Sequence, residues 1–405
     1  MTASRSPVVV LSGHVTGLWV ARALAAEHFR VWTLPVDRHC LARSSGVVDE
    51  VLDPHRGGPR GLASRLLDDE QIPEGSTLVP TTDVGLEALS RHRDALEPRF
   101  QIMVPPWNVV RRLLRKDVFR RTASGLGIPM PVHHGAIETA SVREMDFPVC
   151  CKPSDGARFS SRFGRKVLVA WDAGEFHRAR DLMAEAELSA EVQELVSGPD
   201  TESFNWTAYY DRSGVRRAEF PIRKVRKAPP FYGIGRVVRR CNDDEVTDAM
   251  RERIDLVVRA VGWHGPLSAE FKRDPETGRL LLIEINGRCS FVQQLAWRHG
   301  VNYPVMLAKE ARGEEVSTVQ ADGEPGTLIH LRADLTHALV SRRQEQVGWQ
   351  ALVRPYRERP HFAVWSRSDP WPFAVEWART LLDTTHRLRQ AIRLRTALRR
   401  PDRAR

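Results

Sequence analysis

The sequence predicts an α/β and α+β protein, in which an N-terminal βαβ domain is followed by a domain made of two α+β subdomains. Two observations support this prediction. Residues 7–37 alternate between strand and helix patterns, as a βαβ unit does. Residues 268–288, SAEFKRDPETGRLLLIEINGR, are typical of a β-hairpin that brings two carboxylates and an amide onto one face. A chain of 405 residues has room for two to three domains.

Aliphatic and helical patterns alternate at the start of the chain. Strand patterns at residues 8–11 and 31–34 flank a helical pattern at residues 18–28. The turn at residues 13–17, GHVTG, lacks the GxGxxG spacing of a dinucleotide site, although Asp37 lies about where a ribose-binding acid would. An α/β domain without a nucleotide is therefore the favoured interpretation of this segment.

A third strand of this domain is predicted at residues 78–81. Thr81-Thr82-Asp83 ends this strand, and a helical pattern follows at residues 84–96. Open α/β sheets bind ligands just beyond the carboxyl ends of parallel strands, and an acidic residue there equally suits a helix N-cap. Asp83 is thus predicted either to contact a ligand or to cap the helix.

A small α+β unit is predicted over residues of about 117–195. Its elements are a helix at residues 116–125, a strand at 147–151, a polar loop at 154–166, a helix at 173–186 and an edge strand at 190–196. Lys116 begins the first helix, and Lys152 follows the first strand. The loop, SDGARFSSRFGRK, is too long and polar for a tight turn, and its arginines favour a segment that closes over an anion.

The predicted hairpin has a turn that contains Pro and Gly between its two strands. Because side chains alternate along a strand, Glu270 shares a face with Lys272, and Glu284 shares one with Asn286 and Arg288. With a turn of three or five residues, Glu270 and Glu284 become cross-strand neighbours. The residues expected to point the other way, into a core, are Phe271, Ile283 and Ile285.

The two carboxylates of this hairpin predict a metal site. Like charges directly opposite each other destabilise a sheet by about 0.2–1 kcal/mol, and a divalent cation removes that cost. Mg²⁺ prefers oxygen ligands and takes further ones from water and substrate phosphates, so Glu270, Glu284 and Asn286 form the candidate ligand set. Arg288 is placed to contact phosphate oxygens. Taken alone, the motif also suits a solvated acidic hairpin.

Composition favours a soluble enzyme with anionic ligands. The net charge is +10 and the sequence pI is about 9.8. The chain lacks an apolar run near 18 residues, and its first seven residues lack the apolar region of a signal peptide. Five cysteines without CxxC spacing indicate neither a disulfide framework nor a zinc site. A cytoplasmic location with reduced thiols is therefore expected.

The last residues contribute much of the excess positive charge. Residues 387–405 contain eight arginines and one acid. The ending is compatible with an amphipathic helix that has Leu388, Ile392 and Leu398 on one side. Such a helix packs on the protein itself, on an anionic partner or at an anionic membrane surface. Because basic residues cluster mainly in this tail, nucleic-acid binding is the less favoured function.

Five motifs follow one another along the chain. They are Lys116 before a helix, Lys152 ending a strand, a polar glycine loop, QELVSG at residues 193–198, and Glu-Phe-Lys followed by Glu-Ile-Asn-Gly-Arg. Their order resembles that of the ATP-grasp superfamily. The resemblance covers residues 7–313 and points to carboxylate-amine ligases related to the carbamoyl-phosphate synthetase large chain and D-alanine-D-alanine ligase. It implies a pre-ATP-grasp domain at 1–110, an ATP-grasp domain at 111–313 with a lid at about 117–195 and a catalytic subdomain at about 196–313, and a C-terminal region at 314–405.

The resemblance also implies which residues bind ATP. Lys116 and Lys152 would contact the α- and β-phosphates, as an ammonium group on a flexible stem can. Glu202 would bind the ribose hydroxyls, with Asp200 as the competing acid. The hinge that meets the adenine edge would consist of Gln193, Glu194, Leu195 and Val196.

Metal-binding and catalytic residues are implied in the same way. Glu270, Glu284 and Asn286 match the ligands of two Mg²⁺ ions, with Mn²⁺ as the alternative metal. Arg288 matches the arginine that holds the transferring phosphoryl group. Catalysis would then depend on electrostatic stabilisation by Mg²⁺, Lys152 and Arg288 rather than on a protein nucleophile.

Substrate contacts are implied at two further places. The basic segment 220–235, FPIRKVRKAPPFYGIG, resembles a family loop in which Arg223 and Lys224 would lie near the acyl substrate or the γ-phosphate. A solvated basic hairpin is the alternative interpretation of this segment. Ser290 and Gln293, just after the second acidic motif, are candidate contacts for the acceptor.

The activity implied by the resemblance is ATP-dependent ligation. A small-molecule carboxylate would attack the γ-phosphate, and an amine would capture the acyl phosphate, with release of ADP and phosphate. The alternatives are an ATP-grasp phosphotransferase or carboxylase and, from another class, a basic protein that binds anions or nucleic acid. The expected partners are small molecules, without nucleic acid or a transmembrane segment, and a homodimer is an assembly left open.

Overall fold

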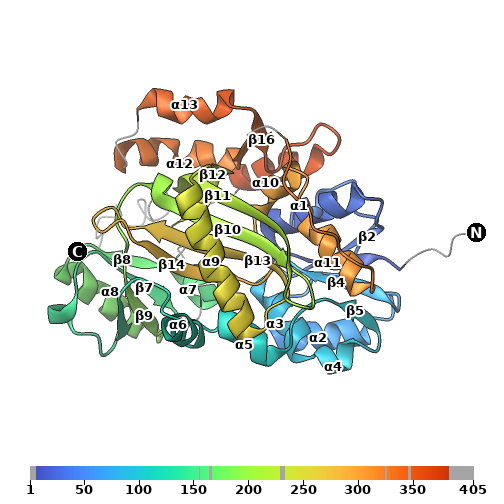
Figure 1. The fold of residues 1–405 in the computed structure, drawn as a ribbon, viewed down its shortest axis with the longest axis horizontal. Coiled ribbons are helices and arrows are strands. Elements are labelled where there is room, and N and C mark those ends of the chain that lie inside the picture. Colours follow the sequence, from blue (N-terminus) through green and yellow to red (C-terminus); the bar gives the residue numbers. More distant parts are fainter. Residues whose placement is uncertain are drawn as a thin grey trace, which may run out of the picture.

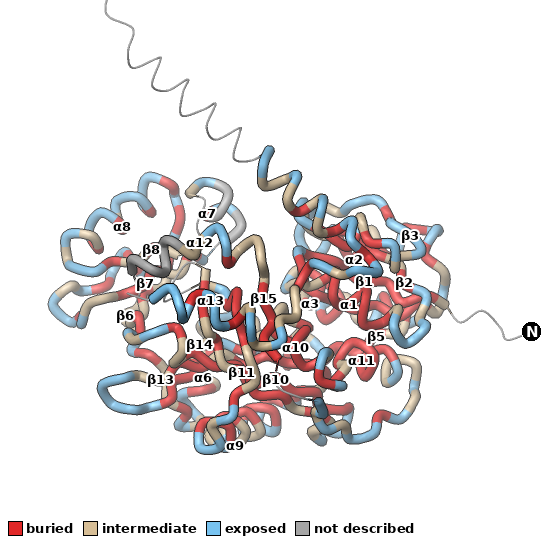
Figure 2. The backbone as a smooth tube through the Cα atoms, turned by 90° about the horizontal axis from the view of Figure 1, so that it is seen from above, coloured by how far each residue is buried: buried red, intermediate tan, exposed pale blue. Residues whose placement is uncertain are grey.

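The computed structural model describes residues 6–154, 156–163, 167–228, 233–323, 326–344 and 348–382. These residues form a parallel five-stranded sheet, an antiparallel four-stranded sheet and a mixed seven-stranded sheet (Figure 1). The four-stranded and five-stranded sheets lie on opposite sides of the seven-stranded one (Figure 1, Figure 2). The predicted α/β and α+β class is confirmed.

The parallel sheet forms the N-terminal part. Its order is β3 (Glu50–Val51), β2 (Val31–Pro35), β1 (Val8–Ser12), β4 (Ser76–Pro80) and β5 (Phe100–Ile102), with helices α1 (His14–Ala25), α2 (Pro59–Asp68), α3 (Asp83–Arg91), α4 (Arg93–Leu96) and α5 (Trp107–Leu114). Strand β1 is buried throughout, because Val9 and Leu11 pack into one core and Val8 and Val10 into another. Strands covered on both faces are continuously aliphatic, and this is why the sequence predicted them. The helix predicted at residues 84–96 is divided into α3 and α4.

The four-stranded sheet follows the order β6 (His133–Ala136), β9 (Ala190–Glu194), β7 (Val149–Pro153) and β8 (Leu168–Ala170). Strand β9 therefore lies between two neighbours, and the prediction of an edge strand there was wrong. The reason is β6, which pairs with its outer side and whose His-His-Gly-Ala sequence has no strand pattern. Helix α8 (Ala173–Glu185) packs on this sheet.

A helix replaces part of the polar loop predicted at residues 154–166. Helix α7 spans Gly156–Phe163, and Phe159 is buried in the core of the four-stranded sheet. Phe159 and Phe163 lie on one side of the helix, with ring centroids 4.9 Å apart. The packing of these two rings stabilises a helix, although the surrounding sequence has the polar composition of a loop. Residues 155 and 164–166 of the predicted loop lie outside the described residues.

The seven-stranded sheet carries the predicted hairpin. Its order is β14 (Leu280–Asn286), β13 (Gly265–Arg273), β10 (Ser203–Tyr210), β11 (Arg216–Ala228), β12 (Ile234–Arg240), β15 (Thr327–Ile329) and β16 (Pro360–Phe362). Helix α9 (Asp244–Val261) crosses one face (Figure 1), and α10 (Gln293–Arg298) and α11 (Tyr303–Ala311) pack on the other. Strands β15 and β16 follow residue 313, so the C-terminal region extends the sheet that holds the hairpin.

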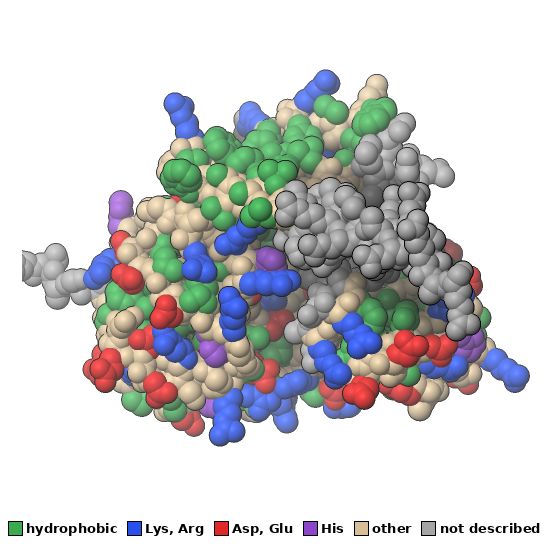
Figure 3. Space-filling view, turned by 180° about the vertical axis from the view of Figure 1, so that it is seen from behind, with side chains coloured by type: hydrophobic (Ala, Val, Ile, Leu, Met, Phe, Trp, Pro, Cys, Tyr) green, Lys and Arg blue, Asp and Glu red, His purple; other side chains and the backbone are tan. Residues whose placement is uncertain are grey.

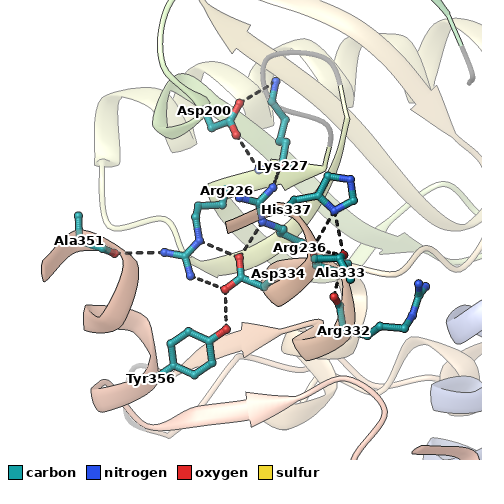
Figure 4. Close-up of polar contacts among 11 residues, drawn as sticks. Asp200, Arg226, Lys227, Arg236, Arg332, Ala333, Asp334, His337, Ala351 and Tyr356 are labelled. Atoms are coloured by element: carbon teal, nitrogen blue, oxygen red, sulfur yellow. Dashed lines mark hydrogen bonds and ion pairs between the residues drawn. The ribbon is translucent and has the colours of Figure 1, made fainter. Parts of the chain in front are cut away.

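A buried carboxylate holds the C-terminal helices α12 (Leu331–Gln344) and α13 (Trp349–Arg357) on this sheet. Asp334 of α12 accepts hydrogen bonds from Arg226 on β11 (2.6 and 2.8 Å), Arg236 on β12 (2.7 Å) and the Tyr356 hydroxyl on α13 (2.6 Å) (Figure 4). Burial alone would raise the pKa of Asp334, but the arginines and Tyr356 outweigh it and lower the pKa. We call these four residues the Asp334 cluster.

Large apolar side chains are exposed in the C-terminal part of the chain. Trp349, Trp365 and Trp371 are 56%, 44% and 68% exposed, and Figure 3 shows hydrophobic side chains gathered at the top of the molecule, where the C-terminal elements lie. Within the described part of the chain, no helix has the length and apolar character needed to span a membrane. The basic tail, residues 387–405, lies outside the described residues, so its contact with an anionic partner or membrane stays a prediction.

Candidate active site

The register of the β13–β14 hairpin places Glu270 directly opposite Glu284, as predicted. The turn between the strands, residues 274–279, has six residues rather than three or five. With a six-residue turn and no irregularity, Glu270 would lie opposite Ile283. Glu284 would then point to the face of the sheet opposite that of Glu270. A β-bulge inserts one extra residue between the pairs Phe271–Leu282 and Glu270–Glu284. Because side chains alternate with a period of two, this residue restores the shared face.

The bulge also changes which residues fill the core behind the hairpin. Ile283 is the extra residue and is only half-buried, so the prediction that it points into the core was wrong. Leu280 and Leu282 are buried instead, in one cluster with Phe271 and Ile285.

A buried lysine neutralises Glu270. The Nζ atom of Lys224 on β11 lies 2.5 Å from a Glu270 carboxylate oxygen, and the Lys224 side chain is 3% exposed. Burial alone would raise the pKa of Glu270, but Lys224 and, at longer range, Lys227 and Lys152 outweigh it and lower the pKa. Glu270 is therefore ionised at neutral pH, as a metal ligand must be. The alternative of a solvated basic hairpin does not hold for Lys224.

Arg223, predicted to act beside Lys224, points to the opposite face of β11. It is the cross-strand partner of Phe204, which lies in the core under α9. Arg223 donates hydrogen bonds to the backbone oxygen of Thr201 (2.6 Å) and to Glu202 (2.8 Å). Consecutive strand residues point to opposite faces, so the structure brings Lys224 rather than Arg223 to the hairpin carboxylates.

Asn286 and Arg288 extend the site toward the N-terminal sheet. The Asn286 amide nitrogen donates to Glu284 (2.9 Å), and its amide oxygen accepts from Arg288 (3.3 Å). Arg288 also donates to Asp83 at the start of α3 (2.7 Å). Burial would lower the pKa of Arg288, but Asp83 outweighs it and raises the pKa. The N-cap of α3 is Thr82, whose hydroxyl accepts a backbone hydrogen bond, so Thr82 fills the capping role considered for Asp83.

The two lysines predicted to bind phosphate lie close enough to interact with each other and with the hairpin. Lys116 is the first residue of α6 (Lys116–Gly125), and its ammonium group donates to the backbone oxygen of Pro153, next to Lys152 (3.0 Å). The pKa of Lys116 is lowered by burial and by the charge of Lys152, while Glu191 and Glu284 act in the opposite direction. These groups therefore share one region between the four-stranded sheet and the hairpin.

Two residues of this region escaped sequence reasoning. Glu191 is the cross-strand partner of Lys152 and lies 3.0 Å from the His133 ring nitrogen. Asn205 on β10 is directly opposite Glu270, donates to Ser268 (3.2 Å), and buries an amide oxygen that has no hydrogen-bond partner among the described residues. The signal for Asn205 was the alternation SFNWTAYY, in which the first aromatic residues alternate with polar ones. Glu191 offered no comparable pattern.

The predicted hinge residues lie at the end of β9. The backbone N–H of Glu194 donates to the oxygen of Val132 (2.8 Å), and its carboxylate accepts from the Val132 N–H (2.9 Å). That carboxylate thus fixes the chain entering β6. Gln193 is two residues from Glu191 and so shares the face on which Glu191 meets Lys152. The next two hinge residues, Leu195 and Val196, are buried.

Both acids considered for ribose binding are engaged by basic side chains. Glu202 accepts from Arg223 (2.8 Å) and from Arg273 (2.5 Å). Asp200 lies 3.5 Å from the Lys227 ammonium group, and both side chains are at most 3% exposed (Figure 4). Glu202 is the more accessible of the two, with 17% of its side chain exposed.

Lys272 and Gln293 also hold the backbone near the hairpin. Lys272 donates to the backbone oxygens of Gly198 (2.9 Å) and Pro199 (2.6 Å), and burial together with Lys227 lowers its pKa to about 7. Gln293 is fully buried, accepts from the Ser290 N–H (2.6 Å) and donates to a backbone oxygen of β13 (3.0 Å). No surface of Gln293 remains for the substrate contact predicted for it.

Neither a family model nor a curated protein sequence matches this chain. Several solved structures match its fold. N5-carboxyaminoimidazole synthetase from Staphylococcus aureus, complexed with ADP, matches with a TM-score of 0.63 at 12% identity, over 84% of this chain and 87% of that one. The biotin carboxylase domain of the Hydrogenobacter thermophilus 2-oxoglutarate carboxylase, with MgADP and bicarbonate, gives 0.60 at 15%, over 80% and 74%. An L-amino acid ligase from Bacillus licheniformis gives 0.58 at 14%, over 76% and 75%.

The chain has an ATP-grasp fold. Its predicted lid corresponds to the four-stranded sheet, and its predicted catalytic subdomain corresponds to the first five strands of the seven-stranded sheet. The residues brought together between them are the two lysines and the acidic hairpin.

The residues of the acidic hairpin and of β10 beside it fit magnesium. Glu270 and Glu284 offer carboxylate oxygens side by side, and Asn286 and Asn205 offer amide oxygens next to them. Within the described ranges, no group of three or more His, Cys, Asp or Glu side chains could hold a metal ion. Two carboxylates suit Mg²⁺ when substrate phosphates and water supply the remaining ligands.

Proposed function

We propose that this protein is an ATP-dependent ligase that joins a small-molecule carboxylate to an amine through an acyl phosphate, with release of ADP and phosphate. The observation that supports this most directly is the pairing of Glu270 with Glu284 in a region shared with Lys116 and Lys152. An acidic pair beside two lysines suits a magnesium–phosphate ligand. Proteins with matching folds include an L-amino acid ligase and complexes with ADP or MgADP.

Nucleotide binding is proposed for the residues around this region. Lys116 and Lys152 would bind the phosphates, and Glu202 would bind the ribose once its arginine contacts rearrange. The adenine edge would meet Gln193, Glu194, Leu195 and Val196. Glu270, Glu284 and Asn286 would hold two Mg²⁺ ions, with Mn²⁺ as the alternative metal. Bound Mg²⁺ supplies positive charge to the phosphate oxygens during transfer.

The proposed reaction needs no protein nucleophile. An oxygen of the substrate carboxylate attacks the γ-phosphorus, the bond to the β–γ bridging oxygen breaks, and ADP leaves. The amine nitrogen then attacks the acyl carbon and loses a proton, and phosphate leaves with the attacking carboxylate oxygen. Lys152 and Arg288 would stabilise the charge on the phosphoryl oxygens, and Arg288 is already held in place by Asp83 before the reaction.

The substrates can be found with a matrix of carboxylates against amines, read as ADP release and confirmed by mass spectrometry. With ¹⁸O-labelled acid and the active amine, we expect one labelled oxygen in the released phosphate. Label in AMP, or amide formation with unlabelled phosphate, would exclude the acyl-phosphate route. Glu284→Gln should abolish the signal, and Glu276→Gln, an exposed acid in the same hairpin, should leave it unchanged.

A bicarbonate-dependent carboxylase is the second candidate. It is favoured by the matches to N5-carboxyaminoimidazole synthetase and to a biotin carboxylase domain that contains bicarbonate. Bicarbonate therefore belongs in the matrix as one of the acids. ADP release that needs bicarbonate and yields a carboxylated amine would favour the carboxylase, whereas release in bicarbonate-depleted buffer with an organic acid would favour the ligase.

A further inference from the structure

A second group of arginines lines a groove outside the proposed nucleotide site. The groove has a volume of about 640 Å³ and lies between strands β11 and β12, the start of α9 and the chain that joins α13 to β16. Its charged residues are Arg223, Arg239, Arg240, Arg357 and Arg359, with the acids Asp243 and Glu358. Apart from Arg223, none of the residues predicted to contact phosphate or metal lines it.

Two of the groove arginines leave the face of the sheet opposite the acidic hairpin, whereas Arg240, the cross-strand partner of Ile222, leaves the hairpin's face. Arg223 and Arg239 are cross-strand partners, so their side chains leave the same face of the sheet. Lys224, which contacts Glu270, is the next residue along β11 and leaves the opposite face. An anion in the groove would be distinct from the phosphates of ATP, because Lys116, Lys152 and the hairpin carboxylates do not line the groove.

The acids of the groove do not neutralise its arginines. Glu358 accepts from Arg354 (2.5 Å) and Asp243 from Arg273 (3.5 Å), and neither of these arginines lines the groove. Asp243 also caps α9 by accepting from a backbone N–H (3.2 Å).

Three of the arginines have no acidic partner in the part of the chain that the structure describes. They are Arg239, Arg240 and Arg357, and Arg240 lies over the ring of Phe220, 5.6 Å from its centroid. Like charges gathered in one concave surface raise its positive potential and attract anions.

We propose that this groove binds a small anion that carries more than one phosphate group. Guanidinium groups match phosphate oxygens in pairs, with two parallel hydrogen bonds. Three guanidinium groups without acidic partners exceed the charge of a single phosphate, which is about −2 near neutral pH. The volume lies in the range of roughly 300–1,000 Å³ that is typical of small-molecule sites.

Arg223 connects the groove to the proposed nucleotide site. It lines the groove and also holds Glu202 and the backbone of Thr201, which follow the hinge. A phosphate that draws Arg223 into the groove would remove one of the two arginine contacts of Glu202, the acid proposed for ribose, and leave the contact with Arg273. The bound anion would thereby change the affinity of the protein for ATP, and ATP would change the affinity for the anion by the same factor.

The probe for the test is inorganic tripolyphosphate, titrated calorimetrically into the full chain after a non-hydrolysable ATP analogue and Mg²⁺ have filled the nucleotide site. We expect binding that weakens with salt and that becomes about tenfold weaker in Arg239→Gln and in Arg357→Gln. Arg357 is exposed at the end of α13, so this variant serves even if the strand variant fails to fold. Arg60→Gln, an exposed arginine of α2, is the matched control.

Three results would overturn the proposal. Tripolyphosphate could fail to bind once the nucleotide site is filled. It could bind the groove variants as tightly as the parent chain, which would assign binding to the arginine-rich tail. A single-stranded oligonucleotide could also bind the same groove more tightly than tripolyphosphate, which would identify a nucleic-acid surface instead.

Discussion

The Asp334 cluster and the acidic hairpin are two groups of charge on the same sheet, and they are satisfied to different degrees. Asp334 accepts four hydrogen bonds from three side chains and is 1% exposed. Glu270 instead has one lysine, and Glu284, directly opposite, accepts one hydrogen bond from Asn286 and remains exposed. The carboxylate of the Asp334 cluster is fully hydrogen-bonded within the protein, whereas the hairpin carboxylates keep oxygen atoms available to a ligand.

This difference separates a structural role from a binding role. Removing one partner from a complete buried group leaves an uncompensated charge, which is costly to the fold. The two hairpin carboxylates keep oxygen atoms without protein partners on one face, and this suits a ligand that they bind. Mutations in the two groups should therefore act on different measured quantities.

The largest effect on stability is expected from Asp334→Asn. Asparagine keeps the shape but removes the charge that balances Arg226 and Arg236, so the free energy of unfolding should fall by about 3–5 kcal/mol. Urea denaturation followed by circular dichroism measures this change. Tyr356→Phe removes one hydrogen bond of the same group and should cost about 1 kcal/mol. An unchanged urea midpoint in Asp334→Asn would show that the cluster is not what holds the C-terminal helices.

The reverse outcome is expected at the hairpin. Glu284→Gln keeps the shape of a proposed Mg²⁺ ligand and removes its charge, so kcat/KM should fall by about 100-fold or more, while the free energy of unfolding changes by less than about 0.5 kcal/mol. The measurement is steady-state ADP release at limiting Mg²⁺, with Glu276→Gln as the control. Turnover equal to that of the parent chain would remove Glu284 from the metal site.

A smaller effect is expected from Lys272, two residues after Glu270 on β13. Burial lowers the pKa of Lys272 from 10.5 to about 7, so above pH 7 the unfolded chain binds a proton that the folded chain has released. Stability should therefore rise as the pH increases from 7 toward 10.5, by about 1–2 kcal/mol between pH 7 and 9. Denaturation at pH 7, 8 and 9 measures this rise. Lys272→Met should flatten it, and Lys309→Met, at an exposed lysine of α11, should not.

The sequence predicted the elements whose patterns are local. The aliphatic strands of the N-terminal sheet and the two strands of the hairpin were found because burial imposes a regular pattern on them. Strand β6 was missed because His133, His134 and Gly135 have no strand pattern and are ordered by pairing with β9. Helix α7 was missed because one buried ring, Phe159, decides its place.

The candidate site, too, was predictable where its residues lie in one local motif and not where they meet through tertiary contacts. Glu270, Glu284 and Asn286 lie in one motif, so alternation along the strands was enough to group them. The bulge at Ile283 could not be predicted, because it depends on how the six-residue turn closes. The contacts of Arg288 with Asp83 and of Lys224 with Glu270 join residues far apart in the sequence. A periodic sequence pattern cannot predict contacts between residues so far apart in the chain.

The smallest effect is expected from removing the basic tail. Its arginines lie outside every motif proposed to bind ATP, and both the Asp334 cluster and the hairpin take their partners from residues before 357. A chain that ends at residue 387, just before Leu388, should therefore keep its kcat, its KM for ATP and its urea midpoint within experimental error. Steady-state kinetics and denaturation of the truncated and full chains, side by side, measure this. Loss of ATP binding in a truncated chain that still unfolds cooperatively would contradict this prediction. The tail would then have to contribute residues to the ATP site, and the carboxylate oxygens of the hairpin would have a partner within the same chain.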